Sequence, residues 1–95
     1  NVGLTYETSE GQMKKIVSEI QEMINQHEKT NQEGKVRFQE FGSSSLDILV
    51  VYFVDSPKWN DLIDVKEDIN YKIMEIVRSN NSDFAFPSTT VYLNK

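Results

Sequence analysis

The sequence has no cysteine and only one histidine among its 95 residues. Without cysteine the chain cannot form disulfides, thiolate metal sites or a cysteine nucleophile. Long apolar runs are missing as well. The longest, residues 48–54, has seven residues, whereas a membrane-spanning helix needs about 20. No segment of the sequence therefore qualifies as a transmembrane helix.

Basic residues are also scarce, because ten Lys and Arg stand against fifteen Asp and Glu, for a net charge of −5. Nucleic acids and anionic lipid surfaces are bound by clustered basic side chains, and here the basic residues are scattered. The four glycines are isolated from one another, so the sequence offers no phosphate-binding loop. These absences argue against nucleic acid, anionic lipid and phosphate cofactors as partners.

The first third of the chain combines a strand pattern with a helix pattern. Apolar and polar residues alternate over residues 1–7, which is typical of a strand with one buried face. Ser9 and Gln12 have the spacing of a capping box, which predicts that a helix begins there. The helix should bury an apolar stripe with spacings of three and four. That stripe consists of Met13, Ile16, Val17, Ile20, Met23 and Ile24.

The middle of the chain predicts a hairpin followed by a second helix. Residues 35–39 alternate, and the stretch from Phe41 to Ser45 predicts a reversal. Residues 46–54 are apolar on both alternating faces, which is typical of a central strand that is covered twice. A helix is then expected from about residue 57 to residue 79, because Ser56 can cap it and Pro57 suits its first position. Its predicted stripe consists of Leu62, Lys66 through its stem, Ile69, Ile73, Ile76 and Val77.

The order strand, helix, strand, strand, helix, strand predicts an α+β fold. With right-handed crossovers it gives a ferredoxin-like βαββαβ sandwich, a four-stranded antiparallel sheet ordered 4-1-3-2 with both helices on one face. The last strand, residues 84–93, would lie at an edge, which tolerates Pro87 because proline removes one ladder donor. We expect residues 1–95 to form a single domain. Since the chain opens on Asn1 within a strand pattern, we also expect it to be part of a longer protein.

Few residues in the sequence offer chemistry. The carboxylates of Asp61, Asp64, Glu67 and Asp68 follow helical spacing, but an acidic helix face without backbone ligands is usually only solvated. His27 follows the first apolar stripe, where a protonated imidazole would interact favourably with the helix dipole. No second histidine or nucleophile accompanies it. We therefore expect no enzyme activity, no metal site and no cofactor.

The remaining candidate is an apolar surface on the sheet face away from the helices, formed by Leu49, Val51 and Phe53. Burying each of these side chains is worth roughly 1.5–3 kcal/mol, and an exposed apolar patch marks a site of contact. The sequence thus predicts that this face contacts protein outside the chain. The partner is either a neighbouring segment of the parent protein or another subunit.

Three segments carry a likeness to a known family: VGLTYETS at the first strand and helix cap, VRFQEFGSSSLDILVVYFV at the hairpin, and FAFPSTTVYL near the end. The likeness extends over almost the whole length of the chain. The chain resembles the C-terminal α/β domain of the small-conductance mechanosensitive channel family, in which an F-x-F/Y-P-x-x-x-V ending is characteristic.

The resemblance implies a multipass channel of the inner membrane, usually a heptamer, in which transmembrane helices and a middle β domain precede this domain. The copies would form the wall of a cytoplasmic vestibule that scaffolds the oligomer and filters ions without gating by itself. The implied partners are the other copies, the preceding β domain and the permeating ions. An acidic wall would concentrate cations. The alternative on the same fold is an ACT-like regulatory module that binds a small molecule.

Overall fold

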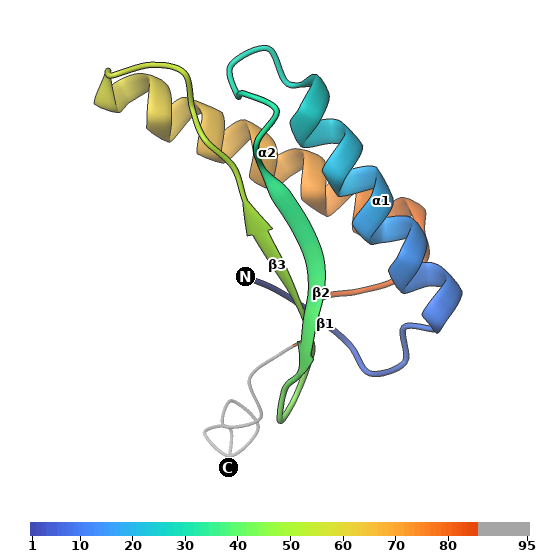
Figure 1. The fold of residues 1–95 in the computed structure, drawn as a ribbon. Helices are drawn as coiled ribbons and strands as arrows, with labels where there is room; N and C mark the ends of the chain where they lie inside the picture. Colours follow the sequence, from blue (N-terminus) through green and yellow to red (C-terminus); the bar gives the residue numbers. More distant parts are fainter. Residues whose placement is uncertain (86–95) are drawn as a thin grey trace.

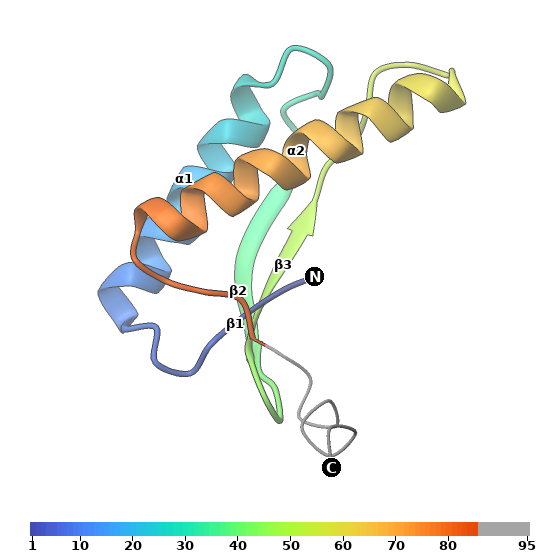
Figure 2. The same cartoon turned by 180° about the vertical axis from the view of Figure 1, so that it is seen from behind.

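The computed structural model describes residues 1–85, which form three strands and two helices (Figure 1). Along the chain these are β1 (Val2–Leu4), α1 (Glu10–Gln26), β2 (Lys35–Phe41), β3 (Leu46–Val51) and α2 (Trp59–Ser79). Seen from behind, α2 crosses in front of the sheet and α1 (Figure 2). The predicted α+β class is confirmed.

The three strands form one antiparallel sheet in the order β1-β3-β2. The central β3 pairs with β1, where Leu4 lies opposite Leu46, and with β2, where Val36 lies opposite Val50. The register of β2 shifts by one residue between Phe38 and Glu40, which is a β-bulge. Within the described residues β2 pairs with β3 alone, so it is an edge strand.

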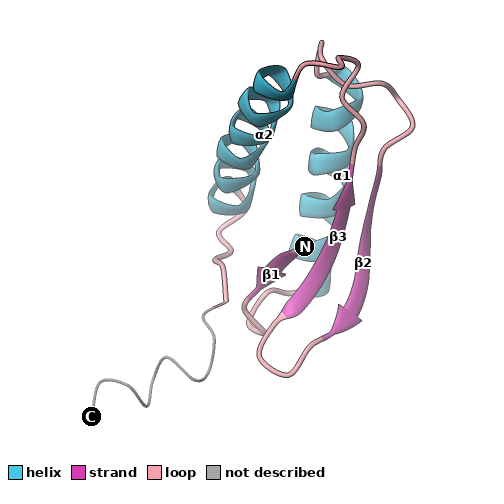
Figure 3. Cartoon of the chain, turned by 90° about the vertical axis from the view of Figure 1, so that its left-hand side faces the viewer, coloured by secondary structure: helices cyan, strands magenta, loops and turns pink. Residues whose placement is uncertain are grey.

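Both helices lie on the same face of the sheet, with α1 beside β2 and α2 toward β1 (Figure 3). The core between the two layers contains side chains from every element. It consists of Leu4, Met13, Ile16, Ile20, Ile24, Val36, Leu46, Ile48, Val65, Ile69, Ile73 and Val77. The predicted apolar stripe of α1 is confirmed, since four of its residues are buried in this core and Val17 and Met23 pack against it.

The start of α1 is fixed by the predicted capping box. Ser9 is the N-cap, its hydroxyl accepts the Gln12 N–H at 3.1 Å, and the Gln12 side chain accepts the Ser9 N–H at 2.7 Å. The side-chain nitrogen of Gln12, Nε2, also donates to the backbone carbonyl of Asn80 at 2.9 Å and to that of Asn81 at 3.2 Å. One side chain therefore closes the start of α1 and holds the end of α2 against it.

The predicted four-stranded sheet is not confirmed, because the described residues contain three strands. Leu4 forms an isolated antiparallel bridge with Phe84, and the Ala85 N–H donates to the Gly3 carbonyl at 2.9 Å. The chain after α2 thus reaches the outer edge of β1, where the fourth strand was predicted. The rest of that predicted strand, with Pro87, lies outside the described residues.

Two predicted strands are shorter in the structure. The first was expected over residues 1–7 but ends at Leu4, because the Thr5 N–H bonds to the Asp83 carbonyl and the Thr8 N–H closes a turn onto Thr5. Tyr6, expected on the buried face, is 51% exposed. β3 ends at Val51 rather than at residue 54.

The second helix differs from the prediction at its start and in its buried stripe. It begins at Trp59, with Lys58 as an N-cap that makes no side-chain bond. The Ser56 hydroxyl instead donates to the Asp61 carboxylate at 2.7 Å. Val65 takes the place that was predicted for Leu62, which is exposed. The end of the helix is as predicted, because Asn81 adopts the positive φ of 59° that suits a terminator.

Candidate contact surfaces and the His27 cluster

The sheet face away from the helices carries the residues that the sequence singled out. Along β3, Ile48 is buried in the core and Val50 packs against it, so the intervening Leu49 and Val51 belong to the opposite face. Both are half-buried. Their cross-strand partners are Arg37 and Lys35, respectively. The face is therefore an apolar strip bordered by two basic side chains.

Phe53 lies beyond the end of β3, in the segment that leads to α2. Its neighbours Tyr52 and Val54 pack against the core, whereas the Phe53 side chain is 48% exposed. The Phe53 carbonyl accepts the Asn31 N–H at 3.0 Å. The structure thus continues the alternation past the strand end, although a contact role for Leu49, Val51 and Phe53 stays a prediction.

A second apolar surface, which the sequence reading missed, is the groove between α1 and the edge of β2, about 940 Å³ in volume. Met13 and Val17 line it from α1, and Phe38 and Phe41 line it from β2. The two phenylalanine rings meet edge-to-face with centroids 5.1 Å apart, and Phe41 is 73% exposed. The signal in the sequence was the predicted strand order, which already placed the second strand at an edge.

The edge of β2 is covered at its start and open beyond. Gln21 accepts the Val36 N–H at 2.9 Å and donates to the Gly34 carbonyl at 3.1 Å. The Arg37 guanidinium donates to the Val36 carbonyl at 2.8 Å. Over the next four residues of β2, no other side chain in residues 1–85 bonds to the backbone. Exposed strand edges are sites of pairing with other chains, so the groove and this edge together form a surface suited to protein contact.

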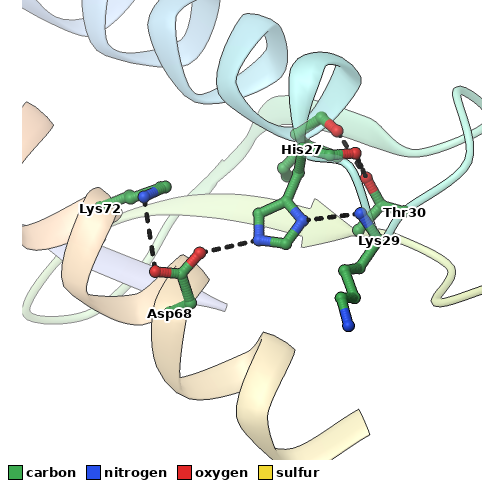
Figure 4. A network of polar contacts seen from close by, with 6 residues as sticks. His27, Lys29, Thr30, Asp68 and Lys72 are labelled. Carbon is green, nitrogen blue, oxygen red and sulfur yellow. Dashed lines mark hydrogen bonds and ion pairs between the residues drawn. The ribbon is translucent and has the colours of Figure 1, made fainter. Parts of the chain in front are cut away.

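His27 lies where α1, the following loop and α2 meet (Figure 4). Its ring is only 8% exposed. Nε2 lies 2.8 Å from Oδ2 of Asp68, and Nδ1 accepts the Lys29 N–H at 3.1 Å. The Lys72 ammonium group also donates to Oδ1 of Asp68, at 3.4 Å. His27 is the C-cap of α1, so its predicted place at the end of the helix is confirmed, and its Nδ1 acts as an acceptor.

Two of the carboxylates of α2, those of Asp61 and Asp68, form hydrogen bonds with other side chains. The hydrogen bond from His27, together with Lys72, lowers the pKa of Asp68 below its ordinary value. Asp61 is bonded to Ser56. In the part of the chain that the structure describes, no three His, Asp or Glu side chains converge so that they could hold a metal ion. Neither described helix combines the length and apolar content needed to span a bilayer.

The family model described as mechanosensitive ion channel MscS, C-terminal, matches residues 1–84. The chain belongs to the MscS family of mechanosensitive channels. An uncharacterized MscS-family protein of Aquifex aeolicus is 41% identical over 99% of the chain. The low conductance mechanosensitive channel YnaI of Escherichia coli is 36% identical over 98% of it, and the small-conductance mechanosensitive channel MscMJ of Methanocaldococcus jannaschii 35% over 99%.

The chain spans about a quarter of each of these relatives, between 26% and 27% of their length. The resemblance drawn from the three sequence segments is therefore confirmed at the level of the family. The MscS-family domain described here is small and α+β, and it exposes apolar side chains on two sides.

Proposed function

We propose that this MscS-family domain forms part of the wall of a channel's cytoplasmic vestibule, where it scaffolds the oligomer and filters ions. In this role it has no enzyme activity and does not gate by itself. The proposal is supported by the family match and by the relatives from Escherichia coli and Methanocaldococcus jannaschii, which are named as mechanosensitive channels.

The observation that carries the scaffolding role is the apolar surface left uncovered on the domain. Leu49 and Val51 form one strip on the outer face of the sheet, and Phe38 and Phe41 line the groove beside α1. Separate apolar patches on a domain of this size favour contact with more than one neighbour. In the proposed channel those neighbours are other copies of the domain and the preceding β domain. The copies form a ring, which the resemblance to the channel family implies is a heptamer.

The filtering role rests on charge. The chain carries a net charge of −5, and a chamber walled by several acidic copies focuses cations by its summed field.

The four-stranded ferredoxin-like sheet belongs to the same proposal, with the fourth strand beside β1. Its support is the bridge from Leu4 to Phe84 and the bond from Ala85 to Gly3.

Val51→Asp in the full-length channel tests the scaffolding role. A carboxylate in a buried subunit contact is costly unless it is paired, so we expect the oligomer to dissociate at lower detergent or denaturant concentration than the wild type. The measurement is native mass spectrometry or size exclusion with light scattering. In the 95-residue chain Val51 is half-buried and lies on the sheet face away from the helices, so the melting temperature of the isolated chain should change little.

Asn70→Asp is the matched control, because Asn70 is an exposed residue of α2 outside both apolar surfaces. It adds the same charge and should leave the oligomer intact. An oligomer that resists Val51→Asp as well as it resists Asn70→Asp would contradict the proposed contact. Equal melting losses in the isolated chain would show that Val51 acts within the domain instead.

A further inference from the structure

The ring of His27 is held at both nitrogens, and this fixes its protonation state. Nδ1 accepts the Lys29 N–H, so it carries no proton. The ring proton therefore lies on Nε2, which donates to Asp68 at 2.8 Å. The geometry of Figure 4 requires the neutral Nε2–H tautomer, because a doubly protonated imidazole has no acceptor to offer Lys29.

The backbone that bonds to this ring also joins two parts of the chain. The Lys29 carbonyl accepts the Asp55 N–H at 3.0 Å, and the Asn31 N–H donates to the Phe53 carbonyl at 3.0 Å. Between them, Thr30 forms an antiparallel bridge with Val54. The loop of residues 27–31 is thus paired with residues 53–55, the segment that carries exposed Phe53.

We propose that protonation of His27 is a pH switch that releases the loop of residues 27–31 from the segment of residues 53–55. The imidazole takes one proton from solvent at Nδ1 and keeps its Nε2–H on Asp68. Nδ1–H then faces the N–H of Lys29, so two donors meet where a hydrogen bond stood. The Glu28–Lys29 peptide must move away from the ring, and this displaces the Cα of Lys29, to which the carbonyl that accepts the Asp55 N–H is attached.

The charges around the ring permit an imidazolium there. His27 lines a shallow pocket between the loop and α2. The charged groups that line the same pocket are Glu28 and Lys29 from the loop and Asp61, Asp64, Asp68 and Lys72 from α2. Four carboxylates face two ammonium groups, so the local charge does not oppose a second ring proton. The cost of protonation is the lost Lys29 bond. The lowered pKa of Asp68 keeps its carboxylate ionised over the range in which histidines titrate.

The switch links mild acidity to the outer surface of the domain. When the loop is released, residues 53–55 lose the two backbone hydrogen bonds that make up this bridge, and Phe53 is no longer held in its present position. Phe53 is one of the three residues predicted to contact protein outside the chain. The inference concerns the chain itself and does not depend on the channel proposal.

Nuclear magnetic resonance of the 95-residue chain tests the switch. At about pH 8 the ¹⁵N shifts of the single histidine should report the Nε2–H tautomer. Protection factors against hydrogen exchange, which are corrected for the intrinsic effect of pH, should fall for Lys29, Asn31 and Asp55 at about pH 5. A lost amide hydrogen bond corresponds to roughly a fivefold loss of protection. The Val36 amide, bonded to Gln21, serves as the internal control and should not change.

His27→Gln is the matched variant, because glutamine offers an uncharged acceptor and donor without titrating in this range. In this variant the amides of Lys29, Asn31 and Asp55 should keep the same protection at both pH values. The proposal is overturned if the wild-type ring titrates while those amides stay protected, or if the ring is the Nδ1–H tautomer at about pH 8. A variant that still loses protection in acid would overturn it too. Should the variant not fold, the two wild-type measurements decide alone.

Discussion

At the scale of single residues, Gly34 has almost no room for a side chain. An added Cβ would lie 2.6 Å from the Val51 carbonyl oxygen and 3.2 Å from both the Tyr52 Cα and the Ile24 Cγ2. Two of these atoms belong to the backbone, so they cannot swing away. Gly34→Ala should therefore lower the free energy of unfolding by about 1–3 kcal/mol, as overpacking does. Urea denaturation of the 95-residue chain measures the change.

Gly11→Ala makes the same substitution at a position that has room for a side chain. Gly11 lies in the first turn of α1, and a Cβ there meets nothing within 4 Å. The substitution should raise the free energy of unfolding by roughly 0.5–1 kcal/mol, because alanine loses less conformational freedom in a helix. If both alanines shift the urea midpoint in the same direction, the close approach at Gly34 is not what keeps that position a glycine.

Asp68→Asn tests the ion pair from the side of α2. In the folded chain the pKa of Asp68 is lowered, first by the hydrogen bond from His27 and also by Lys72. A group of this kind stabilises the fold above its unfolded pKa, about 3.8 here, and the contribution is lost as the pH falls through the lower folded value. The variant should be less stable than the wild type at about pH 7, and the difference should vanish well below about pH 4.

Asp64→Asn serves as the control for that experiment. Asp64 is an exposed residue of the same helix, and no hydrogen bond or ion pair is formed by its side chain within residues 1–85. Its removal should leave the urea midpoint nearly unchanged at both pH values. If Asp64→Asn has the same pH-dependent effect as Asp68→Asn, the cause is the overall charge of α2 rather than the bond to His27.

At the scale of elements, α2 separates buried from exposed isoleucines. Ile69 is 0% exposed and Ile63, on the same helix, is 41% exposed. Ile69→Ala should cost about 2–5 kcal/mol, because it opens a cavity between the helices and the sheet. Ile63→Ala should cost much less, roughly 0.5 kcal/mol or below. Urea denaturation compares the two, and similar losses would contradict the placement of α2 over the core.

α1 was predictable from the sequence because its local signals and its packing agree. The Ser9 and Gln12 capping box and the stripe from Met13 to Ile24 all appear in the structure. In α2 the local signals competed with tertiary bonds. Ser56 and Pro57 suggested an early start, but the Ser56 hydroxyl is bonded to Asp61 and the helix begins later.

The candidate surfaces could be predicted only in part. Alternation along β3 identified Leu49 and Val51, because a strand exposes every second residue to one face. The groove beside Phe41 could not be found this way, since it depends on where α1 lies across the sheet. The His27 contact with Asp68 joins residues 41 positions apart, and periodicity within one helix cannot reveal it.

At the scale of the whole molecule, the two apolar surfaces lie on different sides of the domain. The helices leave one face of the sheet bare (Figure 3), and Leu49 and Val51 occupy that face. The groove lies elsewhere, between α1 and the edge of β2. Unlike patches on one chain suit heterologous contacts, which close into rings when the rotation between copies allows it. Two different surfaces of this kind are what the ring of copies in the proposed function would require.

The bonds of Gln12 have a consequence for how the domain is made. Its side chain completes the cap of an early helix and also binds the carbonyls of Asn80 and Asn81. During synthesis on the ribosome, Gln12 emerges long before those two carbonyls exist. The tie between the start of α1 and the end of α2 can therefore form only after nearly the whole domain has been translated, and a nascent chain released before Asn80 lacks it.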